Sequence, residues 1–373
     1  MSDGQCALGA ANVVAGVESE FANASGGRAV GRWLVAPACR DPRVAAKSFF
    51  RVLYLITQAG HDFLKISNTV FIVVEFIIVT FKQSVMKMSL SKFTSTWNMV
   101  DSEMFNLHKP NQVHILRNTT DKCSKLSKAF VTIYTVCVAN WALVPYITPE
   151  RSLQTGIWLP FNPLDDLKSY VAATTYISIS CLHASYFTAS IDTLSAGLIM
   201  QAVGQLELLN DNLKNLHKCA QTDDPDAVYK KIIECVKHNE YIYKYVKEVE
   251  ECLSIIIFAQ FLTSTIVICM TCVILTLVST ILTQKIIVLA RGLFFYCYYG
   301  TLLYQESNNV IDAIYSGEWY ELDEKCKRAL VVLMVRAQKP FLLSAGKFFT
   351  VSLETFTVVL RRAYSLFAVL NNY

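Results

Sequence analysis

Charged side chains are scarce in this sequence. They make up 17% of its 373 residues, whereas a soluble domain usually has about a quarter. The net charge of +4 is small, so the chain lacks the basic surface of a nucleic-acid-binding protein, and we expect no nucleic-acid partner. The first 46 residues are rich in Gly, Ala and Ser and have no uninterrupted apolar core, unlike a secretory signal peptide. Hydrophobic residues are in excess, at 53%, and they stand in long runs.

The cysteines lack the pattern of a metal site or of a disulfide framework. Twelve are scattered along the chain, and only Cys269 and Cys272 have metal-ligand spacing, between aliphatic flanks and without a matching second pair. Zinc binding needs thiolates and a polar second shell, whereas buried thiols ordinarily act as small apolar packing groups. We therefore expect no metal and no cofactor. No intramembrane His/Asp constellation suggests an enzyme either.

Six runs are interpreted as membrane-spanning helices, each of which needs about 20 mostly apolar residues. The clearest is 253–278, which contains no charged residue. The others are 67–81 with Glu75, 129–147, 169–191, 286–304 with Arg291, and 348–370 with Glu354, Arg361 and Arg362. A seventh candidate, 48–64, is interrupted by Arg51, His61 and Asp62.

Basic residues near the ends of the spans set the orientation, because cytoplasmic connections carry an excess of Lys and Arg. Bases are dense from Lys82 to Lys128, from Lys214 to Lys247 and from Lys325 to Lys339, and they are sparse in the connections between these stretches. The three basic stretches are therefore expected in the cytosol, with the C-terminus outside. Four arginines within residues 1–46 are consistent with an inside N-terminus if 48–64 is counted as a span. The expected fold is an all-α, polytopic seven-helix bundle in a domain 47–373, after an atypical low-complexity segment 1–46.

A series of short motifs runs through the C-terminal third. It comprises Tyr299-Gly300, Glu306-Ser307, Ala313-Ile314-Tyr315, Trp319, Arg336-Ala337-Gln338-Lys339-Pro340, Ala345-Gly346, Ser352-Leu353-Glu354-Thr355-Phe356 and the ending 363–370. Together with the Pro-rich loop at 159–163 and the helix end at 205–209, this series resembles the insect odorant receptor family over roughly residues 67–373. Before residue 67 the sequence departs from the family pattern.

The resemblance implies a function that composition alone does not give. It implies an odorant-binding subunit of a ligand-gated, non-selective cation channel, without enzymatic activity. The partners would be an olfactory coreceptor, in a heterotetramer, and a small volatile odorant. The channel would lie in the plasma membrane of sensory-neuron dendrites, with its pore lined by the last helix.

The same resemblance suggests residues for the pore. Val369 falls where a ring of aliphatic side chains closes the channel, and such a ring gates by dewetting. Asn372 and Tyr373 follow it, and Asn372 could offer a carbonyl oxygen to passing cations; a frayed terminus without function is the alternative. We expect Glu354 at the cytoplasmic vestibule, and we expect Arg361 and Arg362 to point away from the axis, because a positive ring would oppose cation flow. Structural salt bridges are the alternative role for all three, and the more common one.

Two further sets of residues are predicted from depth and residue type. An odorant pocket should be apolar with a few polar groups, and its candidates are Phe71, Ala139, Asn140, Trp141, Tyr176, Ser180, His183 and Tyr298. Helix packing is the alternative role for each. Contact between subunits is expected at an anchor that includes Tyr315, Trp319, Tyr320 and Pro340. The charge run 244–251 is interpreted as a solvated helix face.

Two other receptor classes are considered. A G-protein-coupled receptor is disfavoured, because no Asp-Arg-Tyr follows the third span, no Asn-Pro-x-x-Tyr ends the seventh, and the basic connections give the opposite orientation. A gustatory-type chemoreceptor channel is closer, but the ending Ala363-Tyr364-Ser365-Leu366-Phe367-Ala368-Val369-Leu370 favours the olfactory branch.

Overall fold

The computed structural model of the chain describes residues 63–106, 112–148, 153, 162–216, 226–275 and 281–371. The low-complexity segment 1–46 lies outside the described residues, as does nearly all of the expected first span at 48–64.

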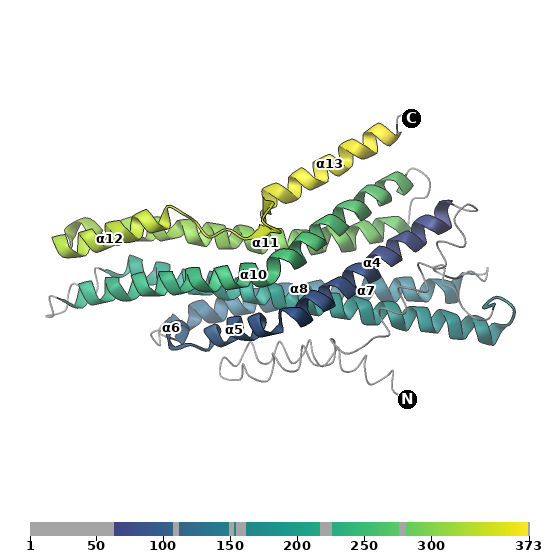
Figure 1. Ribbon diagram of the computed structural model, residues 1–373, viewed down its shortest axis with the longest axis horizontal. Helices are drawn as coiled ribbons and strands as arrows, with labels where there is room; N and C mark the ends of the chain where they lie inside the picture. The colour runs from purple at the N-terminus through teal and green to yellow at the C-terminus, as the bar shows by residue number, and fades with distance from the viewer. Residues whose placement is uncertain are drawn as a thin grey trace.

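Long helices dominate the described part of the chain and form an elongated bundle (Figure 1). They are α7 (Val113–Ile147), α8 (Leu167–Lys214), α10 (Ala227–Leu275) and α11 (Ile281–Ser316). At a rise of 1.5 Å per residue, a helix of the length of α8 is about 70 Å long, more than twice the ~30 Å hydrocarbon core. In length, the longest helices therefore exceed what a bilayer crossing needs.

The sequence of α10 divides into two parts. Residues 227–251 carry many Lys and Glu side chains, whereas 253–275 carry no charge. Among the described residues, the stretch Ala227–Ile268 of α10 is the one helix that is long and apolar enough by composition to cross a membrane, and Val131–Ile147 of α7 is a shorter apolar helix. The charged half of α10 is excluded from lipid by the cost of burying its ions, so we place the membrane crossing of α10 from Leu253 onward.

Shorter helices cover the bundle on one side. The helix α4 (Phe63–Met88) crosses α8 and α10 obliquely, and α5 (Leu90–Val100) and α6 (Glu103–Asn106) then pack against the charged half of α10. Phe105 of α6 is 2% exposed, and its ring lies edge-on to those of Tyr241 and Tyr245, with centroids 5.2 Å away in both cases. One aromatic residue thus fixes a four-residue helix to the bundle.

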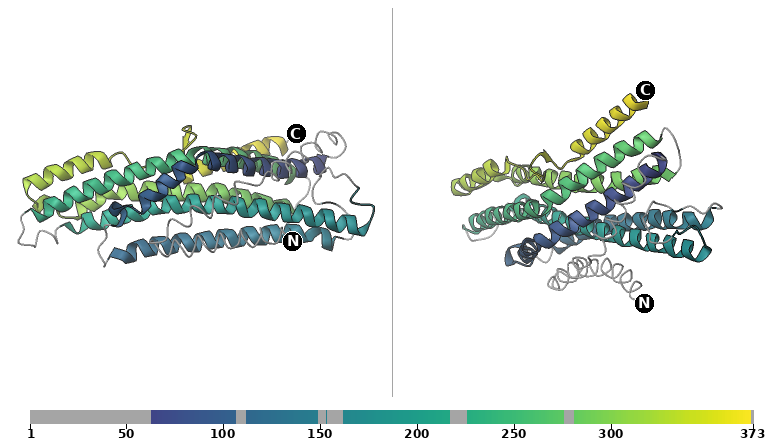
Figure 2. Two further views of the ribbon diagram at one scale, coloured as in Figure 1. Left: turned by 60° about the horizontal axis from the view of Figure 1, so that its bottom comes forward. Right: turned by 45° about the vertical axis from the view of Figure 1, so that its right-hand side comes forward.

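The C-terminal elements fold back and then leave the bundle. After η3 (Trp319–Glu321), α12 (Glu324–Ala337) runs back along α10 and α11. An antiparallel hairpin of β1 (Ser344–Ala345) and β2 (Phe349–Thr350) follows, and α13 (Leu353–Asn371) leads away from it. Figure 2 shows α12 and α13 extending from the hairpin in opposite directions. The helix expected at 348–370 therefore begins later, at Leu353, because residues 348–350 belong to the hairpin and its turn.

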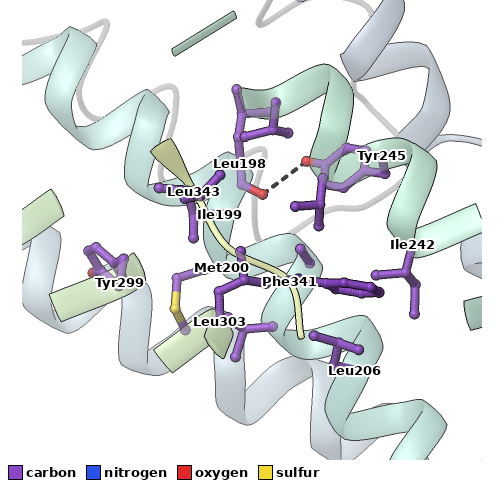
Figure 3. Packing of buried hydrophobic residues seen from close by; sticks show 14 of the residues in the cluster. Leu198, Ile199, Met200, Leu206, Ile242, Tyr245, Tyr299, Leu303, Phe341 and Leu343 are labelled. Atoms are coloured by element: carbon purple, nitrogen blue, oxygen red, sulfur yellow. Dashed lines mark hydrogen bonds between the residues drawn. The ribbon is translucent and has the colours of Figure 1, made fainter. Parts of the chain in front are cut away.

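The core lies where α8, α10 and α11 meet the hairpin (Figure 3). Leu206 of α8, Ile242 of α10, Leu303 of α11 and Leu343 before β1 are each at most 1% exposed. Tyr245 is also fully buried, and its hydroxyl donates a hydrogen bond of 3.0 Å to the carbonyl oxygen of Leu198. This packing gives α10 a fixed position against α8 and the hairpin.

Candidate ligand site and channel helices

A small hollow lies between α7 and α8. It is lined by Val131, Tyr134, Thr135 and Val138 of α7 and by Leu182, Ser185, Tyr186 and Ala189 of α8. The Thr135 hydroxyl donates to the carbonyl oxygen of Val131 at 2.8 Å and lies 3.3 Å from the Tyr186 hydroxyl. The lining therefore combines aliphatic surface with hydroxyl groups and includes no charged side chain. The hollow has a volume of about 10 Å³, the space of roughly one water molecule. Its lining has the chemistry that suits a small neutral ligand, and α7 and α8 must separate to admit one.

The pocket residues predicted from sequence do not line this hollow, although all but Phe71 of α4 and Tyr298 of α11 lie on α7 or α8. Ser180 is buried and donates to the carbonyl oxygen of Tyr176 at 2.7 Å, while the Tyr176 side chain is exposed. Trp141 is half-buried against the core, as is Tyr298 of α11, which stacks on Phe294 with centroids 5.9 Å apart. The remaining candidates are half-buried Ala139 and His183, exposed Asn140, and Phe71, whose side chain lies outside the described residues.

The hollow instead begins about one turn deeper along both helices. The predicted residues of α7 and most of those of α8 are nearer the connection between the two helices, at 148–166. Sequence reasoning missed Tyr134 and Tyr186 because a tyrosine inside an apolar run is equally compatible with packing. The periodic spacing of Val131, Tyr134, Thr135 and Val138 was the available signal, since i, i+3, i+4 and i+7 share one helix face.

A buried ion pair lies one turn below the hollow on α8. Asp192 follows Ala189 by three residues, and its carboxylate lies 2.9 Å from the Lys82 ammonium of α4. The Tyr296 hydroxyl of α11 donates to the same carboxylate oxygen at 2.7 Å. The group joins three helices. Lys82, expected as a base of a cytoplasmic connection, is 0% exposed, so that expectation is wrong: the lysine belongs to the bundle interior, where Asp192 compensates its charge.

A second polar network lies in the charged halves of the helices, outside the membrane crossing. His238 of α10 contacts Gln205 of α8 at 2.9 Å, and the Gln205 amide nitrogen donates to the carbonyl oxygen of Phe105 at 3.1 Å. Because the Gln205 oxygen can only accept, the His238 Nε2 carries the proton in this contact. Burial, with the nearby charge of Lys231, lowers the pKa of His238 to about 4. This histidine is therefore neutral at physiological pH.

Four of the residues considered for the channel, Glu354, Arg361, Arg362 and Val369, lie on the C-terminal helix α13. Glu354, Arg361 and Arg362 are exposed on α13. Val369 belongs to the same helix, while its side chain, together with Asn372 and Tyr373, lies outside the described residues.

Three of the predicted anchor residues, Tyr315, Trp319 and Tyr320, lie near one another at the end of α11 and in η3. The ring of Tyr315 lies edge-on to that of Trp319, with centroids 6.2 Å apart. Tyr315 and Tyr320 are 58% and 59% exposed, and Pro340 follows the end of α12. The outer face of α12 adds an apolar strip that sequence reasoning did not single out, formed by Val331, Val332 and Val335, which are 47%, 65% and 60% exposed.

These features define a class of protein: a helical membrane protein whose bundle extends well past the bilayer and has a small uncharged hollow between two of its helices. The 7tm Odorant receptor family model matches residues 62–364, and the chain belongs to that family. Its family assignment from sequence motifs is thereby confirmed.

Individual relatives agree with this assignment. The chain is 23% identical to Odorant receptor 10 of Aedes albopictus over 266 residues, which cover 69% of this chain and 70% of the relative. It is 23% identical to Odorant receptor Or2 of Anopheles gambiae over 367 residues, or 91% and 95% of the two chains. The solved structure of the insect olfactory receptor OR5 from Machilis hrabei in complex with eugenol superposes with a TM-score of 0.76 at 16% identity, covering 88% of this chain and 86% of that one. The likeness confirms the expected seven-helix membrane fold.

Proposed function

We propose that the protein is the odorant-binding subunit of a heteromeric, ligand-gated, non-selective cation channel in the plasma membrane of olfactory sensory-neuron dendrites. The observation that carries the proposal is the match of residues 62–364 to the odorant receptor family, and the hydroxyl-lined apolar hollow between α7 and α8 supports it with a lining of suitable chemistry. A volatile odorant is small, largely apolar and usually neutral, and this lining offers such a molecule contact surface and hydroxyl partners without a charge to desolvate.

The partner is an olfactory coreceptor, and the contact is proposed at the anchor. The exposed valines of α12 and the exposed Tyr315 and Tyr320, which precede that helix along the chain, supply apolar surface for this contact. Surfaces of this kind, flanked by charged residues, are typical of protein–protein contacts. A tetramer held there leaves α13 of each subunit free to surround a common axis.

Gating follows as a shift between two conformations. An odorant that binds the open conformation more tightly than the closed one moves the population toward the open channel. In the closed channel the aliphatic ring at Val369 excludes hydrated ions by dewetting, and in the open channel the last helices splay so that Val369 leaves the axis.

The test is electrical. Cells that express this chain with an olfactory coreceptor are exposed to a panel of neutral volatile odorants during whole-cell recording. We expect a reversible cation current with at least one odorant class, and no such current in cells expressing the coreceptor alone. A chain that is present at the cell surface with the coreceptor, yet silent to the whole panel, would refute the proposal.

A further inference from the structure

The hairpin between α12 and α13 is a tight, hydrogen-bonded unit. Its strands pair Ser344 with Thr350 and Ala345 with Phe349, and the Val351 amide donates to the carbonyl oxygen of Leu343 at 2.8 Å. Gly346 turns the chain with φ of +59°, in the left-handed region that glycine adopts without steric cost. A unit closed in this way moves as one body. Its contacts with the rest of the protein therefore set the position of the first turn of α13 in space.

One set of attachments joins the hairpin to α10. The Glu250 carboxylate accepts hydrogen bonds from both the backbone amide and the hydroxyl of Ser344, the former at 3.1 Å. One turn further along α10, the carbonyl oxygen of Ser254 accepts from the Gly346 amide at 3.1 Å. The Phe258 ring lies 5.4 Å from that of Phe348. Three consecutive turns of α10 therefore contact the hairpin.

A second set joins the hairpin to α11. The Ser307 hydroxyl accepts from the Phe341 amide at 2.9 Å, where the hairpin segment begins. The Thr301 hydroxyl accepts from the Leu353 amide at 2.9 Å, where α13 begins. Between them, a Cβ at Gly300 would collide with the carbonyl oxygen of Val351, so the two backbones are in close contact. The first residue of α13 is thus tied to α11.

Glu250 differs from the other attachments in strength. A carboxylate that accepts two hydrogen bonds from one residue is a charge-assisted acceptor, roughly twice as strong as a neutral one. It is also the attachment through which α10 holds the edge of β1, since Ser344 is the first strand residue. The neighbouring acid Glu251 is 49% exposed and pairs with Lys92 of α5 instead. Adjacent acids of one helix therefore have separate contacts.

We propose that Glu250 is a positioning residue for gating: by holding Ser344, it keeps the hairpin and the start of α13 in the closed position until α11 moves. The inference rests on the proposed channel function. Without the carboxylate, the hairpin keeps its attachments to α11 but loses its firmest attachment to α10, so α13 leaves the closed position more readily in the absence of odorant.

The experiment measures current without odorant as a fraction of the maximal odorant-evoked current, in cells that express the full-length chain with the coreceptor, after subtraction of the current of coreceptor alone. We expect Glu250→Ala to raise this fraction at least threefold. Glu250→Gln should restore the fraction to within twofold of the native chain, because the amide oxygen still accepts from Ser344. Glu251→Ala, the matched control, should leave it unchanged.

The outcomes separate this inference from the proposed function. A native chain without any odorant current overturns the proposed function itself. A gated native chain whose fraction is the same in Glu250→Ala overturns the role of Glu250 alone, as does a Glu250→Gln variant as leaky as Glu250→Ala. If Glu250→Ala does not reach the surface, Ser344→Ala replaces it, since that change removes one hydroxyl and keeps the backbone amide. An increase of at least twofold supports the inference, and an unchanged fraction overturns it.

Discussion

The ammonium nitrogen of Lys82 lies 2.9 Å from a carboxylate oxygen of Asp192, although the two residues are 110 positions apart and their side chains are 0% and 2% exposed. The pair holds α4 against α8, and the Tyr296 hydroxyl adds α11 to the same oxygen. Two opposite charges that meet away from water compensate each other, whereas either one alone would be left unpaired.

Removing one member of this pair should therefore destabilise the protein strongly. We expect Lys82→Met to lower the free energy of unfolding by about 3–5 kcal/mol, because Asp192 is left as an uncompensated buried charge. Replacing both members, as Lys82→Met with Asp192→Leu, should recover most of the loss. The thermal midpoint of the detergent-solubilised protein measures both effects. Lys87→Met, at an exposed position of the same helix, is the control, and a single variant as stable as the control contradicts the pairing.

The stability of the charged half of the bundle should depend on pH through His238. Its pKa is about 4 in the folded protein and about 6.5 in an unfolded chain. Between these values the unfolded chain binds more protons, so the free energy of unfolding falls as pH decreases from 6.5 toward 4, by about 3 kcal/mol in total.

Thermal midpoints measured across this pH range show whether stability falls on acidification, as predicted. The His238→Gln variant, whose amide can still donate to Gln205, should lose less stability on acidification than the native chain does. The control His114→Gln, at an exposed position of α7, should show the same change of thermal midpoint with pH as the native chain. If the thermal midpoint changes with pH equally in the native chain and in His238→Gln, protonation of His238 is not the cause of the pH dependence.

Filling the hollow between α7 and α8 should weaken odorant sensing. Val138 lines the hollow, so a tryptophan there would occupy the space that the ligand needs. We expect Val138→Trp to raise the half-maximal odorant concentration at least tenfold. Val136→Trp is the matched control, since Val136 is on the same helix but 53% exposed. Equal sensitivity of the two variants would place the odorant elsewhere.

A charge on the outer face of α12 should impair assembly with the coreceptor. Val332 is 65% exposed, and an aspartate buried in a subunit contact would lose its hydration without a partner. Val332→Asp should therefore reduce the amount of coreceptor that co-purifies with the chain by at least fivefold. Val113→Asp, at an exposed position of α7, should not. Undiminished co-purification of Val332→Asp would exclude this face as the contact.

The membrane helices were the part of the fold that the sequence predicted best. The predicted spans at 129–147, 169–191 and 286–304 lie within α7, α8 and α11, because a long apolar run with at most one charge needs no tertiary partner to mark a membrane helix. The continuation of α8 and α10 far past the membrane was harder to predict. There the helices are held by packing of an apolar stripe, such as Ile242, Tyr245, Val249 and Cys252 of α10.

The contacts of charged residues were the hardest feature to predict from the sequence. The predicted span 169–191 stops one residue before Asp192, and Lys82 was counted among cytoplasmic bases, because nothing local marks a pair formed between distant helices. The run 244–251 was expected to be a solvated face, and Lys244, Lys247 and Glu251 are exposed as expected. The expectation did not extend to the other face of the same turns, where Tyr245, Val246 and Val249 are buried. The spacing of 242, 245, 249 and 252 is the helical signal that could have shown it. Two-residue strands are too short to leave a pattern at all.

The position of the C-terminus tests the account most directly, because both the channel mechanism and the arrangement of α13 require that helix to end outside the cell. An epitope tag placed after Tyr373 is stained on intact cells and again after permeabilisation, with a tag inserted in the predicted cytoplasmic connection between α8 and α10 as the internal control. We predict staining of the C-terminal tag on intact cells and of the control tag only after permeabilisation. A C-terminal tag that is reached only after permeabilisation would contradict the orientation and the proposed channel with it.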